Sequence, residues 1–220
     1  MIELPEVLNF IQQRRGQSFV FTTMGSAREW SKGEVGDRDF MYIPSSMGQL
    51  PALALGFALA QPTQRVIAIN GDGCMLMNLG SLVTISAQSP QNLVLCVVNN
   101  GEYEVTGHQP TVAHSSRRTS NSISFSEIAK GAGWRSSTSV STIAELTACE
   151  ELVFHDNGPH FIELMVNPMT GDVVEGIGPF YMNDSVPWEG SMISYLESLR
   201  LAAGYPPFKY TWTSYHSREH

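Results

Sequence analysis

Residues 66–73 read VIAINGDG, an apolar run that leads directly into a glycine–aspartate–glycine turn. A short, continuous run rich in β-branched residues is typical of a strand in a parallel sheet that is covered on both faces. Similar runs occupy residues 19–21, 93–98 and 161–166, with helical patterns between them. The alternation predicts an α/β fold, with a doubly wound, mainly parallel sheet and helices on both of its faces.

Helices are expected between these strands. Residues 1–15 form an amphipathic pattern, residues 50–60 are apolar all round, and residues 79–86 have one apolar face that includes Leu82 and Val83. Capping-box patterns follow, Ser124 with Glu127 and then Thr142 with Glu145. We expect one domain over residues 1–167, followed by an irregular extension over residues 168–220 that holds one helix.

Composition excludes several classes of protein. Of the 220 residues, 42% are hydrophobic and 15% are charged, which suits a folded domain and not a disordered chain. The formal net charge of −8 argues against nucleic-acid binding, and no apolar run is long enough to span a bilayer. Three widely spaced cysteines, Cys74, Cys96 and Cys149, argue against a disulfide framework or a metal ribbon. They favour a reducing, cytoplasmic setting.

The turn after the 66–69 strand is suited to holding an anion and a metal ion. Gly71 and Gly73 let the backbone come close to a phosphate group, and Asp72 between them offers a hard oxygen ligand. Asn99 and Asn100 end the next strand, so they are expected beside Asp72 at the same edge of the sheet. Carboxylate, amide and phosphate oxygens together are typical ligands of Mg²⁺.

This spacing resembles a known signature. The sequence GDG at residues 71–73, a gap of 25 residues and then the Asn pair is similar to the motif of thiamine diphosphate-dependent enzymes. The resemblance implies the thiamine diphosphate-binding fold, with Mg²⁺ bound by the side chains of Asp72 and Asn100 and by the backbone carbonyl of Glu102. It also implies that the diphosphate meets the turn at Gly71 and the backbone N–H groups of Gly73 and Cys74. Cys74 stands where the family usually has Ser or another small residue.

Two upstream segments extend the resemblance. Residues 45–48, SSMG, resemble a GSMG element that precedes a helix in these enzymes, which implies that Ser46, Met47 and Gly48 lie near the cofactor. Residues 22–29, TTMGSARE, resemble the TTG-x-x-x-RE stretch of phosphonopyruvate and sulfopyruvate decarboxylases, with Met24 in place of Gly. Trp30 is a candidate for the apolar wedge under the cofactor in such enzymes, and core packing is its other explanation.

Two downstream segments resemble the same two decarboxylases. Residues 99–111, NNGEYEVTGHQPT, are similar to their NNG…GGQPT loop, and residues 77–82, MNLGSL, also match. His108 replaces the second Gly of that loop, which makes it a candidate catalytic residue for proton transfer, with a solvated loop histidine as the alternative. Altogether the resemblance covers about residues 17–167.

The resemblance also implies a missing part. These enzymes use a Glu on a separate pyrimidine-binding domain to activate the cofactor, and no segment of this chain resembles that domain. We therefore expect a hetero-oligomer in which a partner chain supplies the Glu and the cofactor lies between the two chains.

The implied substrate is a 2-oxoacid with a polar or anionic group at carbon 3. Arg28, Arg117 and Arg118 are candidates to meet that group, although Arg117 and Arg118 also suit a solvated surface. A carboligase of the acyloin or acetolactate type, an oxidoreductase subunit and a non-catalytic scaffold subunit stay open as alternatives.

Overall fold

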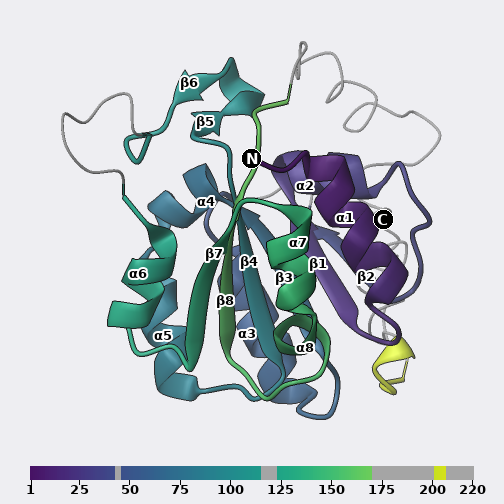
Figure 1. Cartoon of the computed structure of the whole chain (residues 1–220). Coiled ribbons are helices and arrows are strands. Elements are labelled where there is room, and N and C mark those ends of the chain that lie inside the picture. Colours follow the sequence, from purple (N-terminus) through teal and green to yellow (C-terminus); the bar gives the residue numbers. More distant parts are fainter. Residues whose placement is uncertain (43–45, 115–122, 170–200, 207–220) are drawn as a thin grey trace, which may run out of the picture.

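Six parallel strands form the central sheet of the computed structural model, which describes residues 1–42, 46–114, 123–169 and 201–206 (Figure 1). Their order across the sheet is β2-β1-β3-β4-β8-β7, and every pairing in it is parallel. The strands are β1 (Phe19–Thr23), β2 (Asp39–Tyr42), β3 (Val66–Gly71), β4 (Leu93–Asn99), β7 (Ser136–Val140) and β8 (His160–Met165).

The four predicted strands are confirmed as β1, β3, β4 and β8, and they lie side by side in the centre of the sheet. The two edge strands, β2 and β7, were not predicted. β7 reads SSTSV and is only partly buried, so it lacks the apolar run by which a central strand is recognised. β2 has only four residues.

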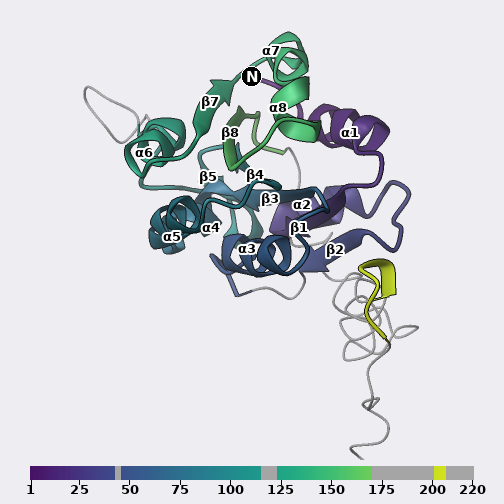
Figure 2. The ribbon, with the colours of Figure 1, turned by 90° about the horizontal axis from the view of Figure 1, so that it is seen from below.

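Helices cover both faces of the sheet (Figure 2). One apolar core lies between the sheet and helices α1 (Leu4–Arg14), α2 (Met24–Trp30), α7 (Ile143–Ala148) and α8 (Glu150–Phe154). A second core lies under helices α3 (Leu50–Ala60), α4 (Asp72–Met77), α5 (Gly80–Gln88) and α6 (Phe125–Gly131). The doubly wound arrangement is therefore confirmed. Among the described residues, no helix combines the length and the apolar character that a membrane crossing requires.

The helix predictions hold with one error. The hydroxyls of Ser124 and Thr142 accept the N–H groups of Glu127 and Glu145, each at 3.2 Å, so both residues are N-caps and begin helices as expected. In α5, Leu82 is buried but Val83 is 60% exposed, so the prediction that Val83 belongs to the buried face was wrong. Most of the predicted C-terminal extension lies outside the described residues, and its domain boundary stays a prediction.

The winding of the chain creates a crevice at one edge of the sheet. From β1 the chain moves outward to β2 and then returns across β1 to β3, so the winding changes direction between β1 and β3. Ligands of open α/β sheets bind at the carboxyl ends of the strands beside such a switch point. Above this edge lies a small unit made of β5 (Glu102–Tyr103), the 3₁₀ helix η1 (Glu104–Thr106) and β6 (Gln109–Pro110) (Figure 1).

A buried carboxylate on β8 fixes the end of β4. Glu163 is 2% exposed, and its carboxylate accepts the side-chain amide of Asn99 at 2.8 Å. It also accepts the backbone N–H groups of Phe125 and Ser126 at the start of α6 and the hydroxyl of Ser124. Four donors and a helix N-terminus together stabilise the buried negative charge. Glu163 thereby joins β8, β4 and α6 directly below the Asn pair.

We expect Glu163→Gln to lower the free energy of unfolding by about 2–3 kcal/mol, because the new amide group faces backbone donors and leaves one or more of them unpaired. Urea unfolding measures the change. Glu127→Gln on the outer side of α6, where the side chain is exposed, is the matched control and should change the stability by less than about 0.5 kcal/mol. Equal effects of the two substitutions would contradict the anchoring role of Glu163.

Candidate functional site

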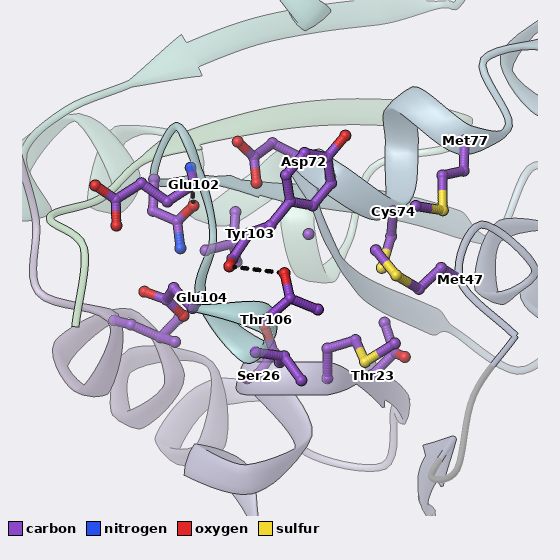
Figure 3. Close-up of a pocket in the computed structure, with 18 residues that line it drawn as sticks. Thr23, Ser26, Met47, Asp72, Cys74, Met77, Glu102, Tyr103, Glu104 and Thr106 are labelled. Atoms are coloured by element: carbon purple, nitrogen blue, oxygen red, sulfur yellow. Dashed lines mark hydrogen bonds between the residues drawn. The ribbon is translucent and has the colours of Figure 1, made fainter. Parts of the chain in front are cut away.

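A pocket of about 300 Å³ opens at the carboxyl ends of β1, β3 and β4. Its wall contains Thr23 and Gly71, which end β1 and β3, and Val98 near the end of β4, together with the first residues of α2 and α4. The β5–η1 segment forms another part of the wall. Figure 3 shows Glu102 and Glu104 on one side of the pocket and Met47, Cys74 and Met77 on the opposite side. The pocket thus lies at the switch point between β1 and β3.

Asp72 is a buried acidic residue in the wall of this pocket. The residue is 2% exposed, and its carboxylate accepts the backbone N–H of Gly101 at 3.0 Å. Burial raises the pKa of Asp72 to about 7, while the N–H groups of Gly73 and Gly101 oppose the rise and the negative charge of Glu104 adds to it. Among the described residues, no Lys, Arg or His forms an ion pair with Asp72.

This environment fits a divalent cation. A buried carboxylate that has only backbone donors lacks a positive partner, and a metal ion would supply one. The described residues contain no cluster of three His, Cys, Asp or Glu side chains that would bind a metal by themselves. A cation here would therefore depend on Asp72, an amide oxygen, a backbone carbonyl and ligand oxygens, as the resemblance implies.

The other two expected metal ligands line the same pocket. Asn100 follows β4, and its side-chain oxygen accepts the backbone N–H of Glu102 at 2.9 Å. This contact sets the turn between β4 and β5. Because Gly101 in the same turn donates to Asp72, the turn is also tied to the end of β3. The fold thus brings Asp72, Asn100 and Glu102 to one wall, although their roles as ligands stay predictions.

Gly73 and Cys74 begin α4 and line the pocket. A Cβ atom at position 73 would lie 2.5 Å from the ring of Tyr103, so only glycine fits beneath that ring. Cys74 is 2% exposed, and burial raises the pKa of its thiol to about 11. The Cys74 side chain is therefore a neutral thiol at pH 7, and it is not suited to act as a nucleophile.

The SSMG segment is only partly at the pocket. Met47 lines it, whereas Ser46 is exposed and its backbone N–H meets the hydroxyl of Tyr42 at 3.3 Å. Gly48 has φ +89°, and a Cβ there would lie 3.0 Å from Asn78 and 3.2 Å from the carbonyl oxygen of Cys74. Gly48 therefore serves the close packing of this segment on α4. Ser45 lies outside the described residues.

Two departures from the family pattern keep a backbone conformation that favours glycine. Met24 has φ +51° and His108 has φ +58°, both in the left-handed region. Each stands where the resembled stretch has Gly. The fold has retained the turn and accepted the strain of a side chain at both positions.

His108 is displaced from the pocket wall. Its Nδ1 lies 2.8 Å from the Glu102 carboxylate, and its side chain is 34% exposed. His108 is not among the residues that line the pocket, so its predicted role in proton transfer would have to act through Glu102 or after a movement of the loop. That role stays a prediction.

Sequence reasoning missed part of the wall. Glu104, Val105 and Thr106 of η1 all line the pocket, as do Met24 and Met77. Nothing in the sequence of the 99–111 loop indicates which of its side chains face the pocket.

Two other candidates lie away from the pocket wall. Trp30 is 4% exposed in the core beside α1, which confirms core packing as its role. Arg28 is also absent from the pocket wall, and one end of its guanidinium contacts the Met169 sulfur at 3.1 Å and the Glu29 carboxylate at 3.4 Å. Arg117 and Arg118 lie outside the described residues.

Comparison with known proteins adds an independent finding. The family model described as "Thiamine pyrophosphate enzyme, C-terminal TPP binding domain" matches residues 23–164. A phosphonopyruvate decarboxylase of Streptomyces viridochromogenes is 31% identical over 74% of this chain and 38% of its own length. Subunit beta of a sulfopyruvate decarboxylase of Methanothermobacter thermautotrophicus is 37% identical over 60% of this chain and 64% of its own length. The chain thus spans less than two thirds of these relatives.

A solved structure shares the fold. A thiamine diphosphate-dependent 4-hydroxybenzoylformate decarboxylase of Rhodococcus jostii RHA1 superposes with a TM-score of 0.64 over 77% of this chain and 33% of its own. The sequence identity is 20%, so this likeness concerns the fold alone.

The raised pKa of Asp72 predicts a pH-dependent stability of the metal-free chain. Between about pH 4 and pH 7 the folded chain keeps a proton on Asp72 that the unfolded chain has released. The folded state binds more protons, so its contribution to stability is present below pH 4 and is lost as the pH rises through about 7.

We expect Asp72→Asn to remove this loss. The variant should gain stability over the native chain as the pH rises from 4 to 8, by an amount on the order of 3 kcal/mol. Thermal unfolding without metal at several pH values measures the difference, and Asp37→Asn at an exposed position is the control. A difference that stays constant with pH would show that Asp72 is ionised throughout.

Proposed function

Because the chain belongs to the family of thiamine pyrophosphate enzymes, whose C-terminal TPP binding domain it carries, we propose that it is one subunit of a split 2-oxoacid decarboxylase. In this proposal the chain binds the diphosphate of thiamine diphosphate through Mg²⁺, and the substrate is a 2-oxoacid with a substituent at carbon 3. The observation that carries the proposal is the buried Asp72, which has no ion-pair partner in the described part of the chain and lies with Asn100 and Glu102 in a pocket at the switch point of the sheet. The names of the relatives support decarboxylation.

Each group of the pocket has a part in this function. Asp72, Asn100 and the carbonyl of Glu102 would hold Mg²⁺, and the turn at Gly71–Cys74 would receive the diphosphate. The cofactor, when bound, supplies the electron sink that makes loss of CO₂ possible. The apolar side chains Met24, Met47 and Val105 would keep water away from the reacting carbon.

The proposed complex contains a partner chain with a pyrimidine-binding domain, which supplies the activating Glu. One support is that the relatives of comparable length are named as subunit beta, a name that implies another subunit. The three cysteines are all free, which agrees with the cytoplasmic location that we propose.

A surface without charges gives the partner a place to bind. Residues 46–64 and 73–101 contain no Asp, Glu, Lys or Arg, although α3, α5 and the end of α4 are partly exposed. Large apolar side chains lie on this uncharged surface, namely Leu53, Leu59, Met77 and Val83, each at least 41% exposed. Such a surface is typical of a protein–protein interface. Because Met77 also lines the pocket, a chain bound there would reach the pocket mouth.

Calorimetry tests the cofactor site. We expect thiamine diphosphate with Mg²⁺ to bind tightly to the mixture of this chain with a pyrimidine-domain chain, and weakly or not at all to either chain alone. Asp72→Ala should abolish binding, because the only charged side chain among the proposed metal ligands is lost. The exposed Asp37→Ala is the control and should bind as the native chain does. Absence of binding in a mixture that is folded and associated would favour the scaffold alternative.

Substitution on α3 tests the partner surface. Leu53→Glu should weaken association with the partner at least tenfold, roughly the effect of a charge buried in an apolar interface. Val35→Glu is the matched control, because Val35 is 37% exposed and Leu53 41%, and Val35 lies in the segment before β2. Analytical ultracentrifugation measures both dissociation constants. If Leu53→Glu associates as tightly as the native chain, the partner binds to another surface.

A further inference from the structure

The charged groups of the pocket wall all have the same sign. Asp72, Glu102 and Glu104 line the pocket, and the described part of that wall contains no Lys, Arg or His. Asp72 has a proposed partner in the metal ion, and the Glu102 carboxylate pairs with the ring of His108 at 2.8 Å. Glu104 therefore contributes a negative charge that neither the proposed metal ion nor His108 compensates.

Glu104 is held firmly in this position. The residue is 7% exposed, and one oxygen of its carboxylate accepts the backbone N–H of Met169 at 2.8 Å. Among the described residues it forms no ion pair with a cationic side chain. Burying a carboxylate with one donor and no cation costs stability. A position that keeps such a group in a pocket is a candidate for a functional role.

The neighbouring helix leaves room for this carboxylate. A Cβ atom on Gly25 would lie 3.2 Å from the second oxygen of Glu104 and 3.2 Å from the Met169 side chain. Gly25 and Ser26 lie in the first turn of α2 and line the pocket with Glu104. The glycine thus keeps η1 and its charge close to α2, at the part of the wall that lies across from Met47 and Met77 (Figure 3).

We propose that Glu104 is a specificity-determining residue, whose charge disfavours a second negative charge on the bound 2-oxoacid. The described part of this pocket wall offers no cation to an anionic substituent at carbon 3, so its neutralisation would fall to groups outside that wall, such as those of the partner chain. The inference rests on the proposed decarboxylase function. It assigns to this chain the selection against a second negative charge on the substrate.

Two probes of equal shape test the charge effect without turnover. 3-Sulfopropanoate carries two negative charges and 3-(methylsulfonyl)propanoate carries one, and neither has the keto group that decarboxylation requires. Calorimetry on the complex of this chain with its partner, loaded with thiamine diphosphate and Mg²⁺, gives both dissociation constants. Glu104→Gln should tighten binding of the doubly charged probe by about tenfold and change the singly charged probe by less than about twofold. The Gln oxygen still accepts the Met169 N–H, so the fold is retained.

Steady-state kinetics with the 2-oxo derivatives of the two probes test the same effect during turnover. Glu104→Gln should raise kcat/KM for the sulfonate acid through KM, with little change for the methyl sulfone, and Glu127→Gln on the exposed side of α6 should change neither. Equal changes for both probes, no change, or no binding of either probe to the loaded complex would overturn the proposal. If the charge-dependent binding appears but neither 2-oxoacid is decarboxylated, the role of Glu104 stands and the decarboxylase function fails.

Discussion

The hydrogen bond from the Gly101 N–H to the Asp72 carboxylate is the contact on which the site depends. It joins the start of α4, directly after β3, to the turn after β4. Because all six strands are parallel, every strand ends at this edge, and the sheet delivers Asp72 and Asn100 to neighbouring positions. Glu163 supports the same arrangement from below by binding Asn99. The proposed metal site thus depends on strand register more than on any local loop.

Two parts of the surface are energetically unfavourable in the isolated chain. Among the described residues, the buried pocket carboxylates of Asp72 and Glu104 have no cationic partner, and α3 and α5 expose large apolar side chains in segments without charged residues. Both cost free energy in the isolated chain, the first through desolvation and the second through contact of apolar surface with water. A bound cation would relieve the first cost and a partner chain the second. The two kinds of surface meet at Met77, so cofactor binding and assembly concern the same edge of the molecule.

The central sheet could be predicted from the sequence because its four inner strands are continuous apolar runs. β7 could not, since an edge strand of Ser and Thr has the composition of a loop. Asp72 and Asn100 were found because a motif with fixed spacing coincided with two strand ends. Glu104 was not found, because its burial depends on contacts with α2 and Met169, 65 or more residues away in the chain. Local patterns cannot report such contacts.

The raised pKa of Asp72 links these features thermodynamically. A carboxylate that is costly to ionise in the isolated chain gains more from a cation than a solvated one would, since the cation removes a penalty already present. Any group that binds only the folded state stabilises it in proportion to its affinity. If the partner binds next to the pocket and excludes water, it strengthens the attraction between Asp72 and the metal. Metal and partner then favour each other's binding. By thermodynamic linkage, the factor by which the partner raises the affinity for the metal equals the factor by which the metal raises the affinity for the partner.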